Sequence, residues 1–423
     1  MSYASDMTRQ IIRMLFMPRE PFPNDRVRIN VLFGRELVGR GHEIDLAMQA
    51  ADETVATGAQ DWFGRTVSVG PTDSKDGFLH RARKHWLGFR HDLRSLSTAK
   101  RPRYEAILIS DKFLIAAIAA VVCSRRGVKF IYWLTFPIPE MELTFARDKT
   151  ARYPWLGRIR GVASGWLLYR WIMPRSDHVF VQSDRMKKNV CAHGIPPTKV
   201  SPILTGFDLT GILPVKPRDP NSVASTTLAY LGTLESSRHL EVLVDMLAQL
   251  RAAGMNARLL LIGDADKPQH RLLLERCAQE LGMTQHVQLT GFLPQAEALC
   301  LIEASDICIS PIFRSPILEV GSPTKLIEYM ALGLPVIAND HPEQEEILRE
   351  SRAGVCVPWG ARHFARAVTW LMKRSRTERA AMGARGRAWV EANRTYARIA
   401  DEVERTYFAM LGSRPNTTAS TNS

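Results

Sequence analysis

Short apolar runs alternate along the chain with longer stretches whose apolar residues recur every three or four positions. The runs fit β-strands buried on both faces, and the stretches fit amphipathic helices that cover a sheet. The runs of the first half are Ile11–Met17, Ile44–Met48, Ala106–Ser110, Phe130–Leu134, His178–Gln182 and Ile203–Thr205. Those of the second half are Leu228–Gly232, Ala257–Gly263, Val287–Thr290, Ile307–Ser310, Pro335–Ala338 and Gly354–Val357. The pattern predicts an α/β protein with two mainly parallel sheets.

A segment rich in turn-forming residues, GILPVKPRDPNSVAS at 211–225, separates the two series. We expect it to be a linker between a domain at residues 1–210 and a second domain at residues 226–393. Apolar residues then recur at helical spacing from Arg394 to Leu411, which predicts an amphipathic terminal helix over 394–412. The polar residues 413–423 predict a disordered tail.

Composition narrows the class of protein. No apolar run reaches the roughly 18 residues of a membrane-spanning helix, and the first residues lack the features of a signal peptide, so we expect a cytoplasmic protein. The six cysteines lack CxxC spacing and fit reduced core residues. The formal net charge of +13 favours an anionic partner, such as nucleic acid, an acidic lipid surface or a phosphorylated small molecule. Nucleic acid ranks last, because no nucleic-acid-binding signature accompanies the charge.

The most informative stretch is SPTKLIEYMALGLPVIAND, residues 322–340. Ser322 can cap a helix that starts at Pro323, and Gly333 can take the left-handed position after its end. Lys325 and Glu328 lie three apart on one face. The N-terminus of such a helix, with a lysine in its first turn, suits a pyrophosphate. The alternative is an ordinary capped helix that carries Lys325 and Glu328 as a surface pair.

Residues 322–336 resemble the donor-binding signature of the retaining GT-B glycosyltransferases, the large family 4-like group that includes sucrose synthase and bacterial mannosyl- and glucosyltransferases. The resemblance implies two Rossmann-like, doubly wound domains facing a cleft, with the C-terminal helix docking back on the first domain. It also implies that Glu328 binds the donor ribose. Members carry an acidic residue eight positions earlier, near the transferring sugar. This chain has Val320 there, and Glu319 would take the role only if the loop holds one extra residue.

A second family feature is a glycine loop after the first strand of the second domain, here YLGTLESSRHLEVL. Gly232 matches the glycine and Arg238 the basic residue that meets the donor diphosphate. Many members have arginine where this chain has Thr233, and Lys325 would compensate. The donor-binding residues implied in this way are Gly232, Thr233, Arg238, Ser322, Pro323, Thr324, Lys325 and Glu328.

The first half resembles the family less closely. The loop Pro18–Arg28 has no glycine, so Arg26 and Arg28 either contact the diphosphate in its place or simply open the following helix. The segment 131–142 lacks the histidine that many members place near the sugar. Glu140 there either orients an acceptor or is a helix-start residue favoured by the dipole. The catalytic residues we expect are Glu319, Arg238, Lys325 and Glu140.

The resemblance implies transfer from a nucleotide sugar with retention and without a metal or other cofactor. Asp264–Asp266 spells the D-x-D of metal-dependent transferases of another fold, but it follows a strand where this family has a turn, so no metal site is expected. Two rival hypotheses remain: a GT-B sugar-nucleotide epimerase or hydrolase, and a catalytically silent GT-B binding partner. The acceptor is expected to be a glycan, a lipid-linked sugar or a small molecule.

Two segments are both basic and aromatic, Phe78–Arg103 and Arg152–Arg175. Tryptophan and tyrosine beside lysine and arginine suit the headgroup layer of an anionic membrane, which would make the protein peripheral at the inner face of the plasma membrane. The alternative is a set of half-buried core aromatics with snorkelling cations.

Overall fold

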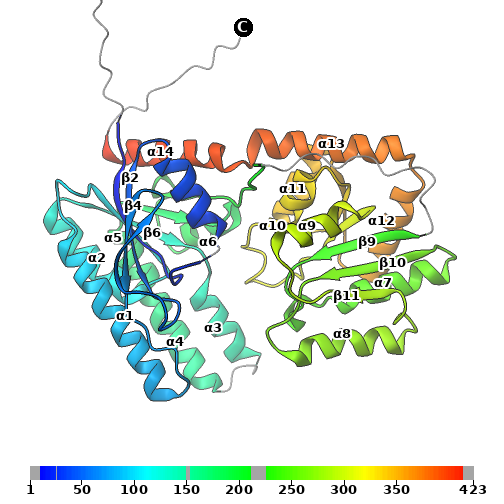
Figure 1. The fold of residues 1–423 in the computed structure, drawn as a ribbon, viewed down its shortest axis with the longest axis horizontal. Coiled ribbons are helices and arrows are strands. Elements are labelled where there is room, and N and C mark those ends of the chain that lie inside the picture. Colours follow the sequence, from blue (N-terminus) through cyan, green and yellow to red (C-terminus); the bar gives the residue numbers. More distant parts are fainter. Residues whose placement is uncertain (1–9, 25, 149–152, 211–224, 413–423) are drawn as a thin grey trace, which may run out of the picture. The chain divides into compact units, whose positions relative to one another are not determined.

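A computed structural model describes residues 10–24, 26–148, 153–210 and 225–412. They form two compact units (Figure 1). The first unit runs to Leu204 and takes up the chain again from Tyr396, and the second unit is Thr205–Thr395. The expected linker, 211–225, lies outside the described residues apart from its last residue, and the expected tail, 413–423, lies outside them entirely.

The first unit is built on an eight-stranded sheet with the order β3-β4-β2-β1-β5-β6-β7-β8. All neighbours pair in parallel except β3 and β4, which form an antiparallel edge hairpin. The central strands are mostly apolar because helices cover both faces. The strands are β1 Arg13–Met17, β2 Glu43–Gln49, β3 Gly58–Trp62, β4 Arg65–Gly70, β5 Ala106–Ser110, β6 Lys129–Leu134, β7 His178–Val181 and β8 Val200–Pro202.

Helices cover this sheet, and an aromatic cluster of Phe16, Phe33 and Trp133 fills the core on one side. The Phe16 and Phe33 rings lie 4.6 Å apart, and Trp133 lies 5.7 Å from Phe33. The helices are η1 Arg28–Val38, α1 Phe78–Thr98, α2 Phe113–Arg126, α3 Ile138–Arg147, α4 Pro154–Trp166, η2 Leu167–Ile172, α5 Met173–Arg175, α6 Asp184–Ala192, η3 Pro197–Lys199 and α14 Tyr396–Leu411.

The second unit has a six-stranded, fully parallel sheet with the order β11-β10-β9-β12-β13-β14. Its strands are β9 Thr226–Leu231, β10 Ala257–Ile262, β11 Val287–Leu289, β12 Ile307–Ser310, β13 Val336–Asn339 and β14 Gly354–Val357. Its helices are η4 Ser236–Arg238, α7 Glu241–Ala252, α8 Pro268–Glu280, α9 Gln295–Glu303, α10 Thr324–Ala331, α11 Pro342–Ser351, α12 Ala361–Met372 and α13 Arg376–Asn393. Two apolar clusters pack on opposite faces of the sheet, as expected for a doubly wound arrangement.

The predicted α/β class and most of the predicted strands are confirmed. The hairpin of β3 and β4 was not predicted, because its first strand, GAQDW, is mostly polar and lies exposed at the sheet edge. The strand expected at Ile203–Thr205 is wrong by a few residues. Strand β8 ends at Pro202, and the chain beyond it leaves the sheet.

The terminal helix α14 belongs to the first unit, as the resemblance implied. Its apolar face packs on η1 and the neighbouring core, with Tyr396, Ile399, Val403 and Tyr407 buried. Arg40 fixes it by ion pairs of 2.8 Å to Asp401 and 3.0 Å to Glu404. The helix starts at Tyr396 and not at Arg394, whose side chain pairs with Glu343 of the second unit at 2.9 Å. None of the described helices combines the length and apolarity that crossing a bilayer requires.

Candidate functional site

Three loops of the second unit lie beyond the carboxyl ends of its parallel strands, which is where parallel sheets bind their ligands. Gly232 follows β9 directly, Gly263 follows β10, and the loop 311–323 leads from β12 to α10. Most of the second-unit residues predicted from the sequence lie on the first and third of these loops or on α10. The candidate site is therefore built from this end of the sheet.

Gly232 is a glycine for two physical reasons. Its φ of +145° is a conformation that side-chain-bearing residues rarely adopt. A β-carbon there would also lie 2.3 Å from Cε and 2.7 Å from Nζ of Lys325. A side chain at 232 would thus occupy the space that Lys325 fills. The backbone of the next loop is equally close, because a β-carbon on Gly263 would lie 2.2 Å from the carbonyl oxygen of Gly232.

Lys325 lies in the first turn of α10 with its Nζ 5.3 Å from the centre of the Tyr230 ring. It forms no ion pair with any described residue, so its charge is not neutralised by a carboxylate in contact. Burial lowers the pKa of Lys325, and the nearby charge of Arg238 lowers that pKa further, whereas Glu328 raises it. Burial likewise raises the pKa of Glu328, against the opposing effect of Lys325. Both groups retain some exposed surface, so an anionic ligand can reach the lysine.

Arg238 and Thr233 of the glycine loop lie in contact. The Arg238 Nε donates to the Thr233 hydroxyl oxygen at 2.8 Å. Tyr230 supports the same loop, since its hydroxyl donates to the Thr233 carbonyl oxygen at 3.1 Å. Thr233, which stands where many family members have an arginine, therefore orients Arg238.

Helix α10 begins at Thr324, and the prediction that Ser322 caps it is wrong. The N-cap position is Pro323, which has no side-chain acceptor, and the Ser322 hydroxyl instead donates to Glu343 Oε1 at 3.0 Å. Glu343 draws the serine away because it is already fixed by its ion pair with Arg394. The predicted end of the helix is confirmed, with Gly333 at a φ of +77° just beyond it.

Tyr329 is a site residue that the sequence analysis passed over. It is fully buried, and its hydroxyl accepts a hydrogen bond of 2.7 Å from the backbone N–H of Leu231 at the end of β9. This bond ties α10 to the strand that carries Gly232. The available signal was its place beside Glu328 in the matched segment, where a tyrosine with a buried hydroxyl needs a partner.

Glu319 lies in a turn that precedes α10, and its backbone N–H donates to the Ser315 carbonyl oxygen at 2.9 Å. Arg314 donates to its carboxylate at 2.9 Å and to that of Asp340 at 3.3 Å. Val320, at the position where the family has its acid, is buried with only 2% of its surface exposed. At the position of the family's acid this loop therefore holds a buried valine, and the neighbouring Glu319 pairs with Arg314.

In the first unit, Glu140 lies in the first turn of α3 and accepts a hydrogen bond of 2.6 Å from the Tyr169 hydroxyl. Its other oxygen, Oε2, is buried and has no hydrogen-bond partner within the described parts of the chain. Arg28 opens η1 and lies with its guanidinium carbon 5.5 Å from the Trp133 ring. The backbone N–H of Arg26 donates to Asn24 Oδ1 at 2.9 Å, and its guanidinium forms no ion pair within the described parts of the chain.

Asp111, directly after β5, was not predicted from the sequence. Its φ of +52° is unusual for a residue other than glycine, and only 7% of its surface is exposed. Burial raises its pKa to about 6, although hydrogen bonds from the Thr135 backbone N–H and hydroxyl oppose that shift. Strain and burial together are typical of functional residues.

The carboxylate of Asp264, in the D-x-D sequence, is engaged by residues of the chain itself. Its oxygens accept hydrogen bonds from Arg271 at 3.1 Å and from the Ala265 N–H at 2.9 Å. In the described portion of the chain, no group of three or more histidine, cysteine, aspartate or glutamate side chains is arranged to hold a metal ion.

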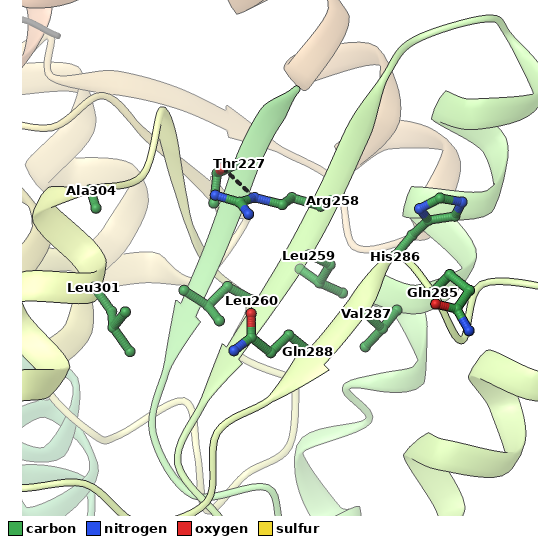
Figure 2. A pocket seen from close by; sticks show the side chains of 10 residues that line it. All are labelled: Thr227, Arg258, Leu259, Leu260, Gln285, His286, Val287, Gln288, Leu301 and Ala304. Atoms are coloured by element: carbon green, nitrogen blue, oxygen red, sulfur yellow. Dashed lines mark hydrogen bonds between the residues drawn. The ribbon is translucent and has the colours of Figure 1, made fainter. Parts of the chain in front are cut away.

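A cavity of about 300 Å³ lies elsewhere in the second unit (Figure 2). Thr227 and Arg258, which line it, stand near the amino ends of β9 and β10, and the Arg258 Nε donates to the Thr227 hydroxyl oxygen at 2.8 Å. It includes none of the residues predicted from the sequence. The cavity and the candidate site thus occupy opposite ends of the same strands.

Similarity to solved structures extends over nearly the whole chain. Sucrose-phosphate synthase of Thermosynechococcus elongatus superposes with a TM-score of 0.73 at 16% identity, over 95% of this chain and 100% of that one. Anabaena HepE, solved in complex with UDP, gives 0.65 at 15% identity, over 94% and 100%. At these identities the likeness concerns the fold, which is that of the GT-B glycosyltransferases.

Family sequence models agree with the fold. "Glycosyltransferase Family 4" matches residues 28–210, and "Glycosyl transferases group 1" matches residues 225–374. The chain therefore belongs to the family 4-like glycosyltransferases.

Curated relatives match over shorter segments. A Salmonella typhimurium protein named as the colanic acid biosynthesis glycosyltransferase WcaL is 24% identical over 191 residues, 45% of this chain and 46% of its own. The phosphatidyl-myo-inositol mannosyltransferase of Mycobacterium leprae is 27% identical over 138 residues, 32% of this chain and 33% of its own. Each match spans less than half of the relative's length.

Proposed function

We propose that this protein is a hexosyltransferase that moves a sugar from a nucleotide-sugar donor to an acceptor in the synthesis of a glycan or glycolipid. The observation that carries the proposal is the convergence of Gly232, Arg238 and Lys325 on the N-terminal end of α10. Two cations and a helix N-terminus at the carboxyl edge of a parallel sheet form a site for a diphosphate. HepE, which shares the fold, has been solved with UDP.

In this proposal the protein aids the departure of the nucleoside diphosphate by electrostatics. As the bond between the sugar and the diphosphate breaks, negative charge grows on the leaving phosphate oxygens. Lys325, Arg238 and the free amide groups of the first turn of α10 would stabilise that charge. Glu328, on the same helix, would accept hydrogen bonds from the ribose hydroxyls. Glu319 is proposed to face the sugar, once Arg314 releases or shares its carboxylate.

We further propose that transfer proceeds with retention at the anomeric carbon and requires no metal, since the cations of the site can do the work of a divalent ion. The acceptor is proposed to be a glycan or a lipid-linked sugar. Glu140 would orient its hydroxyl, because one carboxylate oxygen lacks a partner among the described residues. The place of action is proposed to be the cytoplasmic side of a membrane, to which the protein binds peripherally.

The experiment is a screen of UDP-, GDP- and ADP-sugars with candidate acceptors, in chelator, followed by NMR of the product's anomeric proton. The expected result is acceptor-dependent release of one nucleoside diphosphate and a product of unchanged configuration. Acceptor-independent turnover would identify an epimerase or hydrolase instead, and donor binding without turnover would identify a silent binding partner. Inversion, or a strict need for Mn²⁺ or Mg²⁺, would contradict the mechanism.

A further inference from the structure

The exposed face of α4 carries large apolar side chains that the first unit leaves uncovered. Four large side chains along this one helix are more than half exposed: Trp155 at 65%, Ile159 at 57%, Val162 at 57% and Trp166 at 61%. Soluble proteins rarely expose such a contiguous set without a binding partner.

Their spacing places these residues on one face of the helix. Steps of four, three and four residues return to nearly the same direction, because each residue turns the helix by about 100°. The stripe is roughly 16 Å long at about 1.5 Å per residue. It is much shorter than the roughly 30 Å hydrocarbon core of a bilayer, so it can lie on a membrane but not cross it.

The opposite face of α4 is a glycine seam against α3. A β-carbon on Gly161 would lie 2.8 Å from Leu143 Cγ and 3.1 Å from the Pro139 carbonyl oxygen. Gly157 and Gly165, one turn away on either side, also lie against α3. The helix is therefore held in place by its small residues, and the tryptophan stripe faces away from that contact (Figure 1 shows α3 and α4 side by side).

Charge indicates which partner the stripe suits. At about 100° per residue, Arg158 lies about 70° from the centre of the apolar stripe, whereas Arg160 lies about 130° away on the other side, and both are exposed. Arg160 is anchored to Glu142 of α3 at 2.6 Å, whereas Arg158 forms no ion pair with the described residues. The sequence from Tyr153 to Arg175 holds four arginines and no acidic residue. Exposed tryptophans between arginines match the interface of a membrane with acidic headgroups.

Two parts of the second basic and aromatic segment nominated from the sequence differ in burial. Beyond Trp166, the side chains of Leu168, Tyr169 and Ile172 are buried, so that part belongs to the core. Only the first half of the segment is available to a partner. The core alternative raised from the sequence is thus correct for the second half and wrong for the first.

We propose that α4 is the membrane-docking element of this protein and lies in the surface of an anionic bilayer through Trp155, Ile159, Val162 and Trp166, with Arg158 at the lipid phosphates. The inference deepens the proposed function, on whose membrane-side acceptor it rests. It assigns the docking to one helix of the first unit.

The test measures binding of the full chain to vesicles of phosphatidylcholine with and without phosphatidylglycerol, in the absence of donor and acceptor. The expected result is binding to the anionic vesicles that weakens with salt. Trp155→Ser/Trp166→Ser should weaken it at least about tenfold, and Arg158→Glu should weaken it by a similar factor. The control is Trp370→Ser, which removes an exposed tryptophan of the second unit. The guanidinium carbon of Arg374 lies 3.0 Å from the centre of this ring, and the variant should change binding by less than about twofold.

Thermal melts of the double variant should match the parent, because both tryptophans are exposed. Equal binding to neutral vesicles, no binding to either kind, or unchanged binding by the double variant would overturn the inference. So would a parent dimer that the double variant converts to a monomer, since a second copy would then be the occupant. Nucleotide binding, measured on the same variants, separates this outcome from failure of the proposed function.

Discussion

Lys325 and Gly232 share one space: the lysine Cε lies 2.3 Å from where a β-carbon on residue 232 would stand. Gly232→Ala should therefore push Lys325 out of the site and also strain a backbone with φ at +145°. We expect nucleoside diphosphate binding to be lost and the free energy of unfolding to fall by about 1–3 kcal/mol. Calorimetric titration and denaturant unfolding would measure the two effects.

The matched control is Gly254→Ala. Gly254 also has a positive φ, +85°, but a β-carbon there meets nothing within 4 Å. It should lose stability from backbone strain and keep its nucleotide affinity. Retained binding in both alanine variants would show that the space at Gly232 does not matter to the ligand.

Lys325→Met should weaken binding of a nucleoside diphosphate far more than binding of the parent nucleoside. The lysine charge meets only the phosphates, and a hydrogen bond to a charged group contributes about 1.5–3 kcal/mol. Titrations with both ligands give the ratio directly. A parallel loss of nucleoside affinity would instead mean that the variant has disturbed the whole site.

Diphosphate binding should take up protons at mildly alkaline pH. Burial and Arg238 lower the pKa of Lys325, so part of the free protein loses the lysine proton at a pH below the ordinary pKa of lysine. The bound anion favours the charged form and raises that pKa again, so affinity falls as pH rises through the lowered value. Titration calorimetry in buffers of different ionisation enthalpy counts the protons. Binding that exchanges none in the parent, or as many in Lys325→Met, would refute this origin.

Glu328→Gln and Glu319→Gln should differ in kind. The first variant should bind the donor more weakly by about 1.5–3 kcal/mol, because an amide accepts hydrogen bonds from the ribose hydroxyls less well than a carboxylate does. The second should lower turnover while donor binding changes little, as for an interaction made mainly in the transition state. Steady-state kinetics with donor titration separates them. If Glu319→Gln turns over like the parent, another residue faces the sugar.

Asp111→Asn should stabilise the protein at neutral pH. Burial raises the pKa of Asp111 from 3.8 to about 6, so the folded state keeps this proton to higher pH than the unfolded chain does. Its contribution is therefore favourable below about pH 4 and is lost as pH rises to about 6, at a cost of up to about 3 kcal/mol. Asparagine tolerates the positive φ. Unfolding at pH 4 and pH 7 should show a gain only at pH 7, and an equal change at both would exclude the titration.

The sequence predicted the parts of this fold that depend on local pattern. Ala106–Ser110, Ile307–Ser310 and Gly354–Val357 were found to the residue, because strands of a parallel sheet appear as continuous apolar runs. The polar edge strand β3 has no such signal. Local pattern also failed at Ser322, whose capping role was lost to Glu343, a residue brought near only by the tertiary fold.

In the candidate site, too, the residues of short motifs could be predicted from the sequence, whereas contacts between distant segments could not. Gly232, Arg238, Lys325 and Glu328 could be nominated because each holds a place in a short motif. The contact of Lys325 with Gly232, and the bond from Tyr329 to Leu231, join segments far apart in sequence and required the structure. Asp111 could not be found beforehand, since its unusual φ and its burial leave no mark on the sequence.

The central claim is that the second unit holds a nucleoside diphosphate between Lys325 and the glycine loop. The most direct measurement is thermal or chemical unfolding of the full chain with UDP, GDP and ADP in the presence of chelator. We expect one nucleotide, at about 100 times its dissociation constant, to add roughly 2.7 kcal/mol to the free energy of unfolding. Lys325→Met should lose that gain. No stabilisation by any of the three, or full stabilisation of Lys325→Met, would contradict the account.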